Sequence, residues 1–493
     1  MKMQTPFFGG FNQVLFGRQP VSTAQRIARE IDKVKAASLN GLAQLFEDYL
    51  EPGLFRPSAH YGPNSRQRHF GQATTFWAFL AQVLNPGGSC REAVRQVQAM
   101  LAAQGAPALP AANTSAYCQA RARLCAKWLG AIFEKLGEGL RSRLTSNQLW
   151  CGRRVLVIDG TGVSMPDTDA NQAAWPQPGN QAAGCGFPVA GLVGCFCLGS
   201  AALLRVVVCR WQDHEALVWR RLWEFFEAGD VVLADRAYCS FGSMAALSQR
   251  GMDLVLRLHQ RREADFRKGK RIGKDQRLVV WEKPQRLKSW SVQAWAELPE
   301  EITLRMVRLC VAEPGFRTRE VVLITTLLDE EEIPLEDLAE LYRRRWEVEL
   351  FFRDIKTTLA MDVLRCHSPQ MVEKEILMHA IAYNLIRLLM HRAAVSYNCT
   401  LARLSFKGSL DTIRAVAAQF GAPKLPHRTA IRLMDALMQL IVSDPVPLRP
   451  NRVEPRAKKR RPKNYILLNK PRHQMLAPPH RNRPPKHPKA ALS

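Results

Sequence analysis

Apolar residues recur at helical spacing through the first 150 residues of the chain. This spacing places the apolar side chains on one face of a helix, which can then pack against a core. Ser89 follows an Asn-Pro-Gly-Gly turn and is a typical cap for the helix that it begins. We expect residues 1–150 to form a helical region, with helices at residues 22–50, 74–84, 89–100 and 114–140.

Short apolar runs replace the helical spacing after residue 150. Their lengths are typical of buried strands, and amphipathic segments separate them. This alternation predicts an α/β fold. Over residues 151–257 we expect strands at 153–158, 231–234 and 253–257, an apolar hairpin at 187–209, and helices at 213–227 and 243–250.

Residues 258–333 are different, because alternating apolar and polar positions follow a densely basic stretch at 259–277. Alternation with a period of two is typical of strands. We expect a small β domain here, with strands at 278–281, 290–295, 302–311 and 319–325.

The segment 334–361 has the pattern of one long helix. At about 100° per residue, four polar side chains share one narrow stripe: Tyr342, Arg345, Glu349 and Lys356. One interpretation is a solvated face that ion pairs such as Arg345 with Glu349 stabilise. The other is a binding site, in which the helix brings together four polar side chains with different functional groups.

The pattern of the remaining chain predicts helices followed by a basic tail. Helical patterns occur at 368–396, 410–420 and 429–440, and we expect His379 and His391 to be packed inside the first of them. From residue 446 the chain is rich in Pro, Arg and Lys, which predicts a disordered tail that attracts nucleic acid.

The whole chain is strongly basic, with a formal net charge of +26 over 493 residues. Such a surface is expected to bind polyanions, and nucleic acid is the main candidate. Residues 182–208 are long and apolar enough to span a bilayer, but their glycines favour the strand hairpin. With no secretory signal at the N-terminus, we expect a cytoplasmic protein that does not bind membranes.

Twelve cysteines are scattered without a disulfide framework, so we expect reduced thiols. Cys185, Cys195 and Cys197 come closest to a metal cluster, but no paired ligands accompany them, which argues against zinc.

Three carboxylates are the candidates for chemistry: Asp159 and Asp235, each at a strand end, and Glu349 on the helix stripe. Two carboxylates about 4 Å apart repel by roughly 4 kcal/mol at an effective dielectric of about 20. If the sheet brings them together, they must be protonated or neutralised by a divalent cation. Oxygen ligands favour Mg²⁺ or Mn²⁺, and two such ions can catalyse phosphoryl transfer.

Two further features leave alternatives open. The short helices between residues 74 and 140 fit either a helix-turn-helix DNA reader or a helical bundle that presents basic side chains. Trp281, Trp290 and Trp295 lie among basic segments and fit either stacking on bases or packing in the core, which is the commoner use.

Tyr342, Arg345, Glu349 and Lys356 reproduce the Y-(2)-R-(3)-E-(6)-K spacing, and this signature resembles that of bacterial insertion-sequence transposases of family four. The segments Asp159-Gly160-Thr161 and Asp235-Arg236-Ala237-Tyr238 resemble the two Asp motifs of that family. The resemblance extends over most of the chain up to about residue 400, and the helix signature is its most specific part.

The resemblance implies an RNase H-like catalytic core interrupted by a β-rich insertion, with helical N-terminal and C-terminal regions. The implied parts are a DNA-binding region (1–150), the core in two pieces (151–257 and 334–400), the insertion (258–333), a helical region (401–445) and the basic tail (446–493).

The implied activity is metal-dependent DNA cleavage at transposon ends followed by strand transfer to target DNA. Asp159, Asp235 and Glu349 would be the catalytic triad and would hold two Mg²⁺ (or Mn²⁺) ions. The candidate DNA-binding residues are Tyr342, Arg345 and Lys356, together with Arg236, Tyr238 and Arg353 beside the motifs. The implied partners are double-stranded DNA, namely the terminal inverted repeats and the target, and a second copy of the chain in a synaptic dimer, located at the bacterial nucleoid.

Two alternatives remain from other functional classes. A nuclease or resolvase with the same fold would cut DNA without joining it. A DNA-binding protein descended from a transposase would do neither, although such a protein has no need of three converging acids.

Overall fold

The computed structural model describes residues 39–55, 69–310, 320–422 and 425–447, together with a few isolated positions between 468 and 475. The predicted helix at 22–50 is therefore described only from residue 39, and residues 39–45 are helical. The predictions for the basic tail lie outside the described residues.

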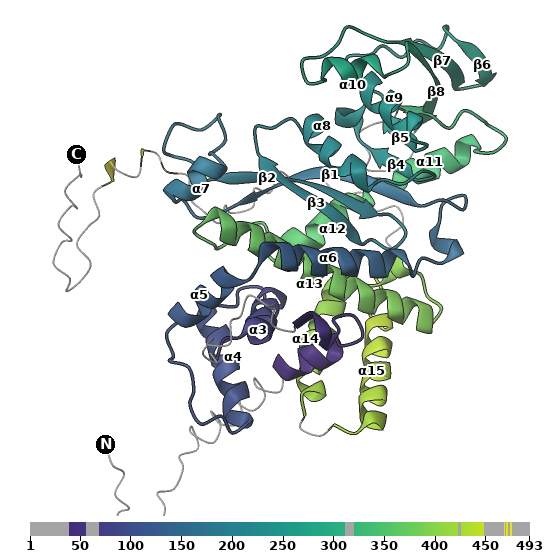
Figure 1. Cartoon of the computed structure of the whole chain (residues 1–493). Helices are drawn as coiled ribbons and strands as arrows, with labels where there is room; N and C mark the ends of the chain where they lie inside the picture. The colour runs from purple at the N-terminus through teal and green to yellow at the C-terminus, as the bar shows by residue number, and fades with distance from the viewer. Residues whose placement is uncertain are drawn as a thin grey trace, which may run out of the picture.

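One mixed sheet of nine strands forms the centre of the described structure (Figure 1). Its order is β3-β2-β1-β4-β5-β9-β8-β7-β6. β1, β4 and β5 are parallel, whereas the other neighbouring pairs are antiparallel. The strands are β1 (Val155–Ser164), β2 (Val189–Cys197), β3 (Leu203–Arg210), β4 (Val231–Ala234), β5 (Asp253–Arg257), β6 (Lys270–Gly273), β7 (Gln276–Glu282), β8 (Glu301–Cys310) and β9 (Glu320–Thr325).

Helices cover the sheet and extend away from one of its faces (Figure 1). α6, α12 and α13 lie on that face, and α8 and α9 lie on the other side. The α-helices are α3 (Gln72–Leu84), α4 (Cys90–Ala103), α5 (Ser115–Arg123), α6 (Ala126–Arg141), α7 (Asp169–Ala174), α8 (Glu215–Val218), α9 (Phe241–Gln249), α10 (Val292–Ala296), α11 (Leu335–Arg344), α12 (Glu347–Arg353), α13 (Pro369–Ser396), α14 (Phe406–Phe420) and α15 (His427–Val442).

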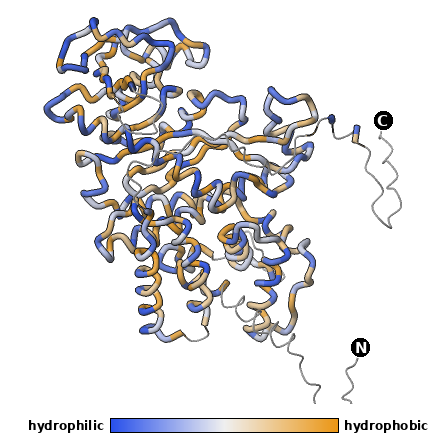
Figure 2. Tube along the Cα trace, turned by 180° about the vertical axis from the view of Figure 1, so that it is seen from behind, coloured by the Kyte–Doolittle hydropathy of each residue, from blue (hydrophilic) through white to orange (hydrophobic). Residues whose placement is uncertain are grey.

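The hydrophobic core follows the central strands and the long helix α13. Hydrophobic positions run along the sheet, and hydrophilic positions gather on the outer loops (Figure 2). His379 and His391 are buried within α13, as the sequence predicted. β2 and β3 are the predicted apolar hairpin, and no helix among the described residues is long and apolar enough to cross a membrane.

The strands of the β-rich insertion extend the central sheet. β9 pairs with β5, with Val255 opposite Thr325, so the sheet continues through β8, β7 and β6. The predicted strand at 290–295 is wrong, because this segment forms helix α10. The Ser291 side chain caps that helix, while the buried rings of Trp290 and Trp295 pack at 5.5 Å.

The predicted single helix at 334–361 is also wrong. α11 ends at Arg344, α12 begins at Glu347, and a π-helical turn (Asp354–Thr358) follows. Between the two α-helices the backbone bonds tighten to a spacing of three residues, as from Arg345 N to Tyr342 O at 3.1 Å. Because tight and wide turns rotate the chain by different angles, a uniform helical wheel does not describe this segment.

Two other helices are shorter than predicted. Residues 114–140 form α5 and α6, which break at residues 124–125, instead of one helix. Residues 213–227 form the short helix α8 and a 3₁₀ helix (Trp219–Phe225). Trp219 and Trp223 are buried there, so packing of two large rings accompanies the tighter turn.

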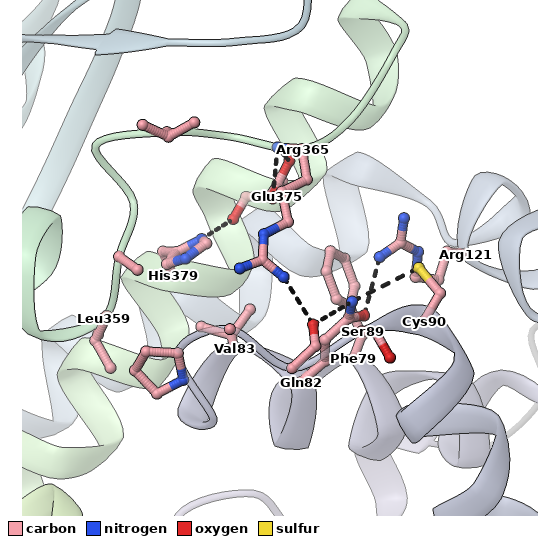
Figure 3. A pocket seen from close by; sticks show the side chains of 15 residues that line it. Phe79, Gln82, Val83, Ser89, Cys90, Arg121, Leu359, Arg365, Glu375 and His379 are labelled. Carbon is pink, nitrogen blue, oxygen red and sulfur yellow. Dashed lines mark hydrogen bonds between the residues drawn. The ribbon is translucent and has the colours of Figure 1, made fainter. Parts of the chain in front are cut away.

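A polar cluster around the buried Glu375 joins the N-terminal helices to the loop that follows the π-helical turn (Figure 3). The carboxylate of Glu375, from α13, accepts backbone N–H bonds from Arg365 and Cys366 at 3.0–3.1 Å. The Arg365 guanidinium in turn donates to the carbonyl oxygen of Gly88, in the turn before α4, at 2.8 Å. Glu375 thereby fixes the loop through which the two regions are connected.

We expect Glu375→Ala to destabilise the protein by about 2–4 kcal/mol, because it leaves buried backbone N–H groups without acceptors. The measurement is urea unfolding followed by tryptophan fluorescence. Glu373→Ala is the matched control, since this exposed residue lies on the same helix turn and should change stability by less than about 0.5 kcal/mol. Equal effects of the two substitutions would contradict the role of Glu375.

Candidate active site

The parallel pairing of β1 and β4 brings the two predicted aspartates together. Ile158 pairs with Ala234, so Asp159 and Asp235 follow at the same level on strands about 4.8 Å apart. β4 ends at Ala234, whereas β1 continues to Ser164. Asp159 therefore lies where β1 begins to extend beyond its parallel neighbour β4.

Helix α12 brings Glu349 to the same region. Asp159 lies opposite Gly194 on β2, and the Phe352 ring packs so closely on Gly194 that an added Cβ would lie 2.9 Å from it. Glu349 is one helical turn before Phe352, and its side chain is exposed. The missing side chain at Gly194 thus lets the helix approach the strand that carries Asp159.

Arg345 supplies positive charge to the carboxylates. It is only 7% exposed, and its guanidinium lies 5.1 Å from the Trp346 ring and 5.8 Å from the Tyr342 ring. Its buried Nε has no hydrogen-bond partner. A buried cation of this kind favours the ionised form of neighbouring acids.

Asp159 is difficult to ionise in the folded protein. Burial raises the pKa of Asp159 to about 6, and the carboxylates of Glu215 and Glu349 also raise it. The backbone N–H of Gly160, at 2.9 Å, and the charge of Arg345 act in the opposite direction. The negative charge is therefore not fully compensated by the protein's own groups.

One carboxylate oxygen of Asp235 lacks a hydrogen-bond partner. Its Oδ1 atom is buried and has no hydrogen bond. Tyr342 lies close by and is 2% exposed. Burial raises the pKa of Tyr342 to about 12, with Asp235 raising it and Arg345 lowering it. The Tyr342 hydroxyl is therefore neutral at physiological pH.

These residues fit a divalent cation by their chemistry. All the candidate ligands are carboxylate oxygens, and the unpartnered Oδ1 of Asp235 is a suitable first contact. Among the described residues, no three acidic, histidine or cysteine side chains form a ready-made metal site. A bound cation would therefore have to draw the carboxylates closer together.

A groove of about 830 Å³ adjoins Asp159 along β1. Lys356 lines it and donates a hydrogen bond to the Thr161 hydroxyl at 2.9 Å. The Trp211 ring packs over Gly162, where an added Cβ would lie 2.7 Å from it, and the side chain is 47% exposed. The groove thus offers a cation and an aromatic face along β1, starting at Gly160, the residue after Asp159.

The remaining predicted residues occupy different environments. Arg236 donates to Gln260 at 3.2 Å, and Arg353 is exposed on α12. Tyr238 is only 1% exposed, and its hydroxyl donates to Glu215 Oε2 at 3.3 Å. The surface of Tyr238 is thus not open to a ligand in this structure. Arg121, on α5, also points inward, with its guanidinium 4.6 Å from the Phe79 ring.

Glu215 is the acidic residue that sequence reasoning missed. It begins α8 and packs against Gly160 of β1, on the face of the strand opposite to the Asp159 side chain. The sequence placed it on an ordinary amphipathic helix, and it follows no strand end. Its position depends on how the segment after β3 folds back over the sheet. A local sequence pattern does not predict this arrangement.

Comparison with known proteins gives a consistent result. The family described as Transposase DDE domain matches residues 150–385. The transposase InsG for insertion sequence element IS4 of Escherichia coli (strain K12) is 28% identical over 425 residues, which cover 85% of this chain and 92% of that protein. The putative transposase InsL for insertion sequence element IS186A, from the same organism, is 38% identical over 65 residues, 13% of this chain and 18% of that protein.

A solved structure is similar at a lower level. The cryo-EM structure of the piggyBac transposase synaptic complex with hairpin DNA aligns with a TM-score of 0.41 and 9% sequence identity, over 79% of this chain and 80% of that one. A likeness of this strength supports no conclusion about the site.

We expect Asp159→Asn to stabilise the metal-free protein at pH 8 and to have little effect at pH 4. An unfolded aspartate ionises near its ordinary pKa, but folded Asp159 ionises near 6, so the stability of the wild type falls as the pH rises through about 6. The measurement is thermal unfolding with a chelator across this range. Glu224→Gln, an exposed control, should show no such trend, and a pH-independent gain for Asp159→Asn would contradict the assignment.

Proposed function

The chain belongs to the DDE transposases of insertion sequences, and on this premise we propose that Asp159, Asp235 and Glu349 are the acidic triad with which it cuts transposon ends and transfers them to target DNA. The observation that carries the assignment is the register of β1 with β4, which sets the two aspartates side by side, together with α12, which adds Glu349. These three acids come from distant parts of the chain.

The family uses divalent metal ions, and for this chain we propose two Mg²⁺ (or Mn²⁺) ions held by the triad. Such ions activate a water or a 3′-hydroxyl and stabilise the leaving oxygen at phosphorus. The protein's own contribution is placement and charge. Asp235 presents its unpartnered Oδ1, and Arg345 balances part of the negative charge around Asp159.

The fold supports an RNase H-like core. The first five strands have the order β3-β2-β1-β4-β5, and β2 is antiparallel to its two neighbours. The aspartates lie at the carboxyl end of β4 and beside it on β1, where open α/β sheets bind ligands. The β-rich insertion enters after β5 and returns through β9 to α11.

DNA is the substrate, and we place its strand in the groove along β1. Lys356 provides a cation for a phosphate, and the exposed Trp211 ring provides a face for a base or a sugar. Arg353 and Arg236 lie at more open positions where they can contact phosphates. Tyr342 and Arg345 are buried. We propose that they orient the carboxylates from below the surface that the DNA contacts.

We also propose roles for the N-terminal helices and for a second copy of the chain. We propose that the helices before residue 150 bind DNA through exposed residues such as Arg91, Arg95 and Arg123, since Arg121 is directed inward. A synaptic homodimer is proposed because two ends must be held together during transposition. A nuclease that cuts without joining is the alternative, and the assay below separates the two.

We expect Asp159→Asn, Asp235→Asn and Glu349→Gln each to lower cleavage and strand transfer by about a thousandfold or more. Purified protein is incubated with Mg²⁺ and DNA that carries the terminal inverted repeats, and nicked and joined products are measured. Glu340→Gln, an exposed acid on α11, is the control and should retain activity. Undiminished activity in Glu349→Gln would refute the triad, and nicking without joining would favour the nuclease.

For Lys356→Ala we expect weaker binding of end DNA and a smaller salt dependence. Loss of one phosphate contact should reduce the slope of log K against log salt concentration by about 0.9. Fluorescence anisotropy at several salt concentrations measures both quantities. Lys407→Ala removes an exposed charge on α14, away from the groove and from the helices before residue 150, and should leave the slope nearly unchanged. An unchanged slope in Lys356→Ala would remove Lys356 from the DNA path.

A further inference from the structure

The π-helical turn after α12 carries two charged side chains that have different partners. In this turn the Leu359 N–H bonds to the carbonyl oxygen of Asp354, five residues back, at 3.0 Å. Such wide turns are rare and are frequently found at functional sites. The Asp354 carboxylate accepts a hydrogen bond from Arg387 of α13, whereas Lys356 donates to Thr161 of β1. One short turn therefore connects the long core helix with the groove along β1.

The ion pair between Asp354 and Arg387 is buried and held from several sides. Its nitrogen–oxygen distance is 2.8 Å, and the two side chains are only 9% and 6% exposed. Arg387 Nε also donates to the Tyr383 hydroxyl at 3.1 Å, and that hydroxyl donates to a backbone carbonyl between β2 and β3 at 2.6 Å. Three rings surround the guanidinium at 5.0–5.4 Å, those of Phe351, Tyr383 and Phe406. The guanidinium is therefore fixed, and the Asp354 carboxylate has to reach it.

This requirement selects the register of the turn. Buried apolar side chains such as Ile355 and Leu359 tolerate repacking within a similar volume. A buried ion pair adds little stability compared with apolar residues of the same volume, but either charge alone would be costly to bury. The pair therefore favours the one backbone arrangement in which carboxylate and guanidinium meet. That arrangement also sets the direction of Lys356, two residues after Asp354.

We propose that Asp354 and Arg387 are positioning residues, which hold the π-helical turn in the register that directs Lys356 toward a DNA phosphate. This inference rests on the proposed function, because that function places the DNA strand in the groove along β1. Asp354 and Arg387 line a separate cavity of about 1090 Å³, whereas Lys356 lines the groove. The pair thus acts on DNA only through the turn.

The test is a double-mutant cycle on the affinity of the full-length protein for end DNA, measured by fluorescence anisotropy at several salt concentrations. It compares the wild type, Asp354→Asn, Lys356→Ala and the variant with both substitutions. We expect Asp354→Asn to lower affinity about fivefold and the salt slope by up to about 0.9, the share of one phosphate contact. When Lys356 is already alanine, Asp354→Asn should change affinity by less than about twofold, because the group that it positions is absent.

A matched control excludes an effect of net charge. Neutralising an acid makes the protein more positive, which by itself favours DNA binding. Asp411→Asn makes the same charge change at an exposed position on α14, and it should bind DNA at least as tightly as the wild type does.

A second variant keeps the test independent of folding. Asp354→Asn leaves the Arg387 charge buried without its partner, which destabilises the protein. Combining Asp354→Leu with Arg387→Met removes both charges and fills the site with apolar atoms. We expect this variant to unfold in urea at a concentration close to that of the wild type, yet to show the smaller salt slope.

The outcomes separate this inference from the proposed function. An equal loss of affinity from Asp354→Asn with and without Lys356 would overturn the positioning role and leave Lys356 in the DNA path. A wild-type salt slope in the folded variant that lacks both charges would overturn it as well. Wild-type affinity and slope in Lys356→Ala would instead overturn the placement of DNA in the groove, and the positioning role with it.

Discussion

Repulsion between carboxylates is the constraint on which this structure depends. β1 and β4 set Asp159 and Asp235 at the same level of the sheet, and α12 carries Glu349 on one face of it, while Glu215 packs against Gly160. Like charges about 4 Å apart would cost roughly 4 kcal/mol per pair at an effective dielectric of about 20. The protein compensates only in part, through Arg345 and the Gly160 N–H, and the raised pKa of Asp159 measures the remainder. Part of the negative charge around Asp159 is therefore left without compensation from the protein's own groups.

The packing around the site holds these charges in place. Glycines on β1 and β2 make the necessary space, since Gly194 admits Phe352, Gly160 admits Glu215 and Gly162 admits Trp211. After the π-helical turn, Glu375 ties the following loop to α13, and Arg365 ties it to the turn before α4.

Much of this architecture was accessible from residue patterns. The strands at β1, β4 and β5 and the β2–β3 hairpin were confirmed, as were helices α3, α4 and α13. The failures share a cause. Trp290 and Trp295 alternate like residues of a strand, but both bury against each other from a helix that Ser291 caps. The segment 334–361 has one helical periodicity, but it contains a tight turn at Arg345 and a wide turn after Arg353. In both segments tertiary packing overrode the local preference.

The sequence by itself determined the types of element, the basic character of the chain, and the identity of Asp159, Asp235, Glu349 and the stripe residues as candidates, because periodicity and motif spacing are local properties. Only the tertiary structure decided which of these side chains meet. Strand register placed the two aspartates at one level, burial turned Tyr342, Arg345 and Tyr238 inward, and the fold of the segment after β3 brought in Glu215. These outcomes depend on contacts between residues far apart in the chain, and no periodic pattern along the sequence encodes such contacts.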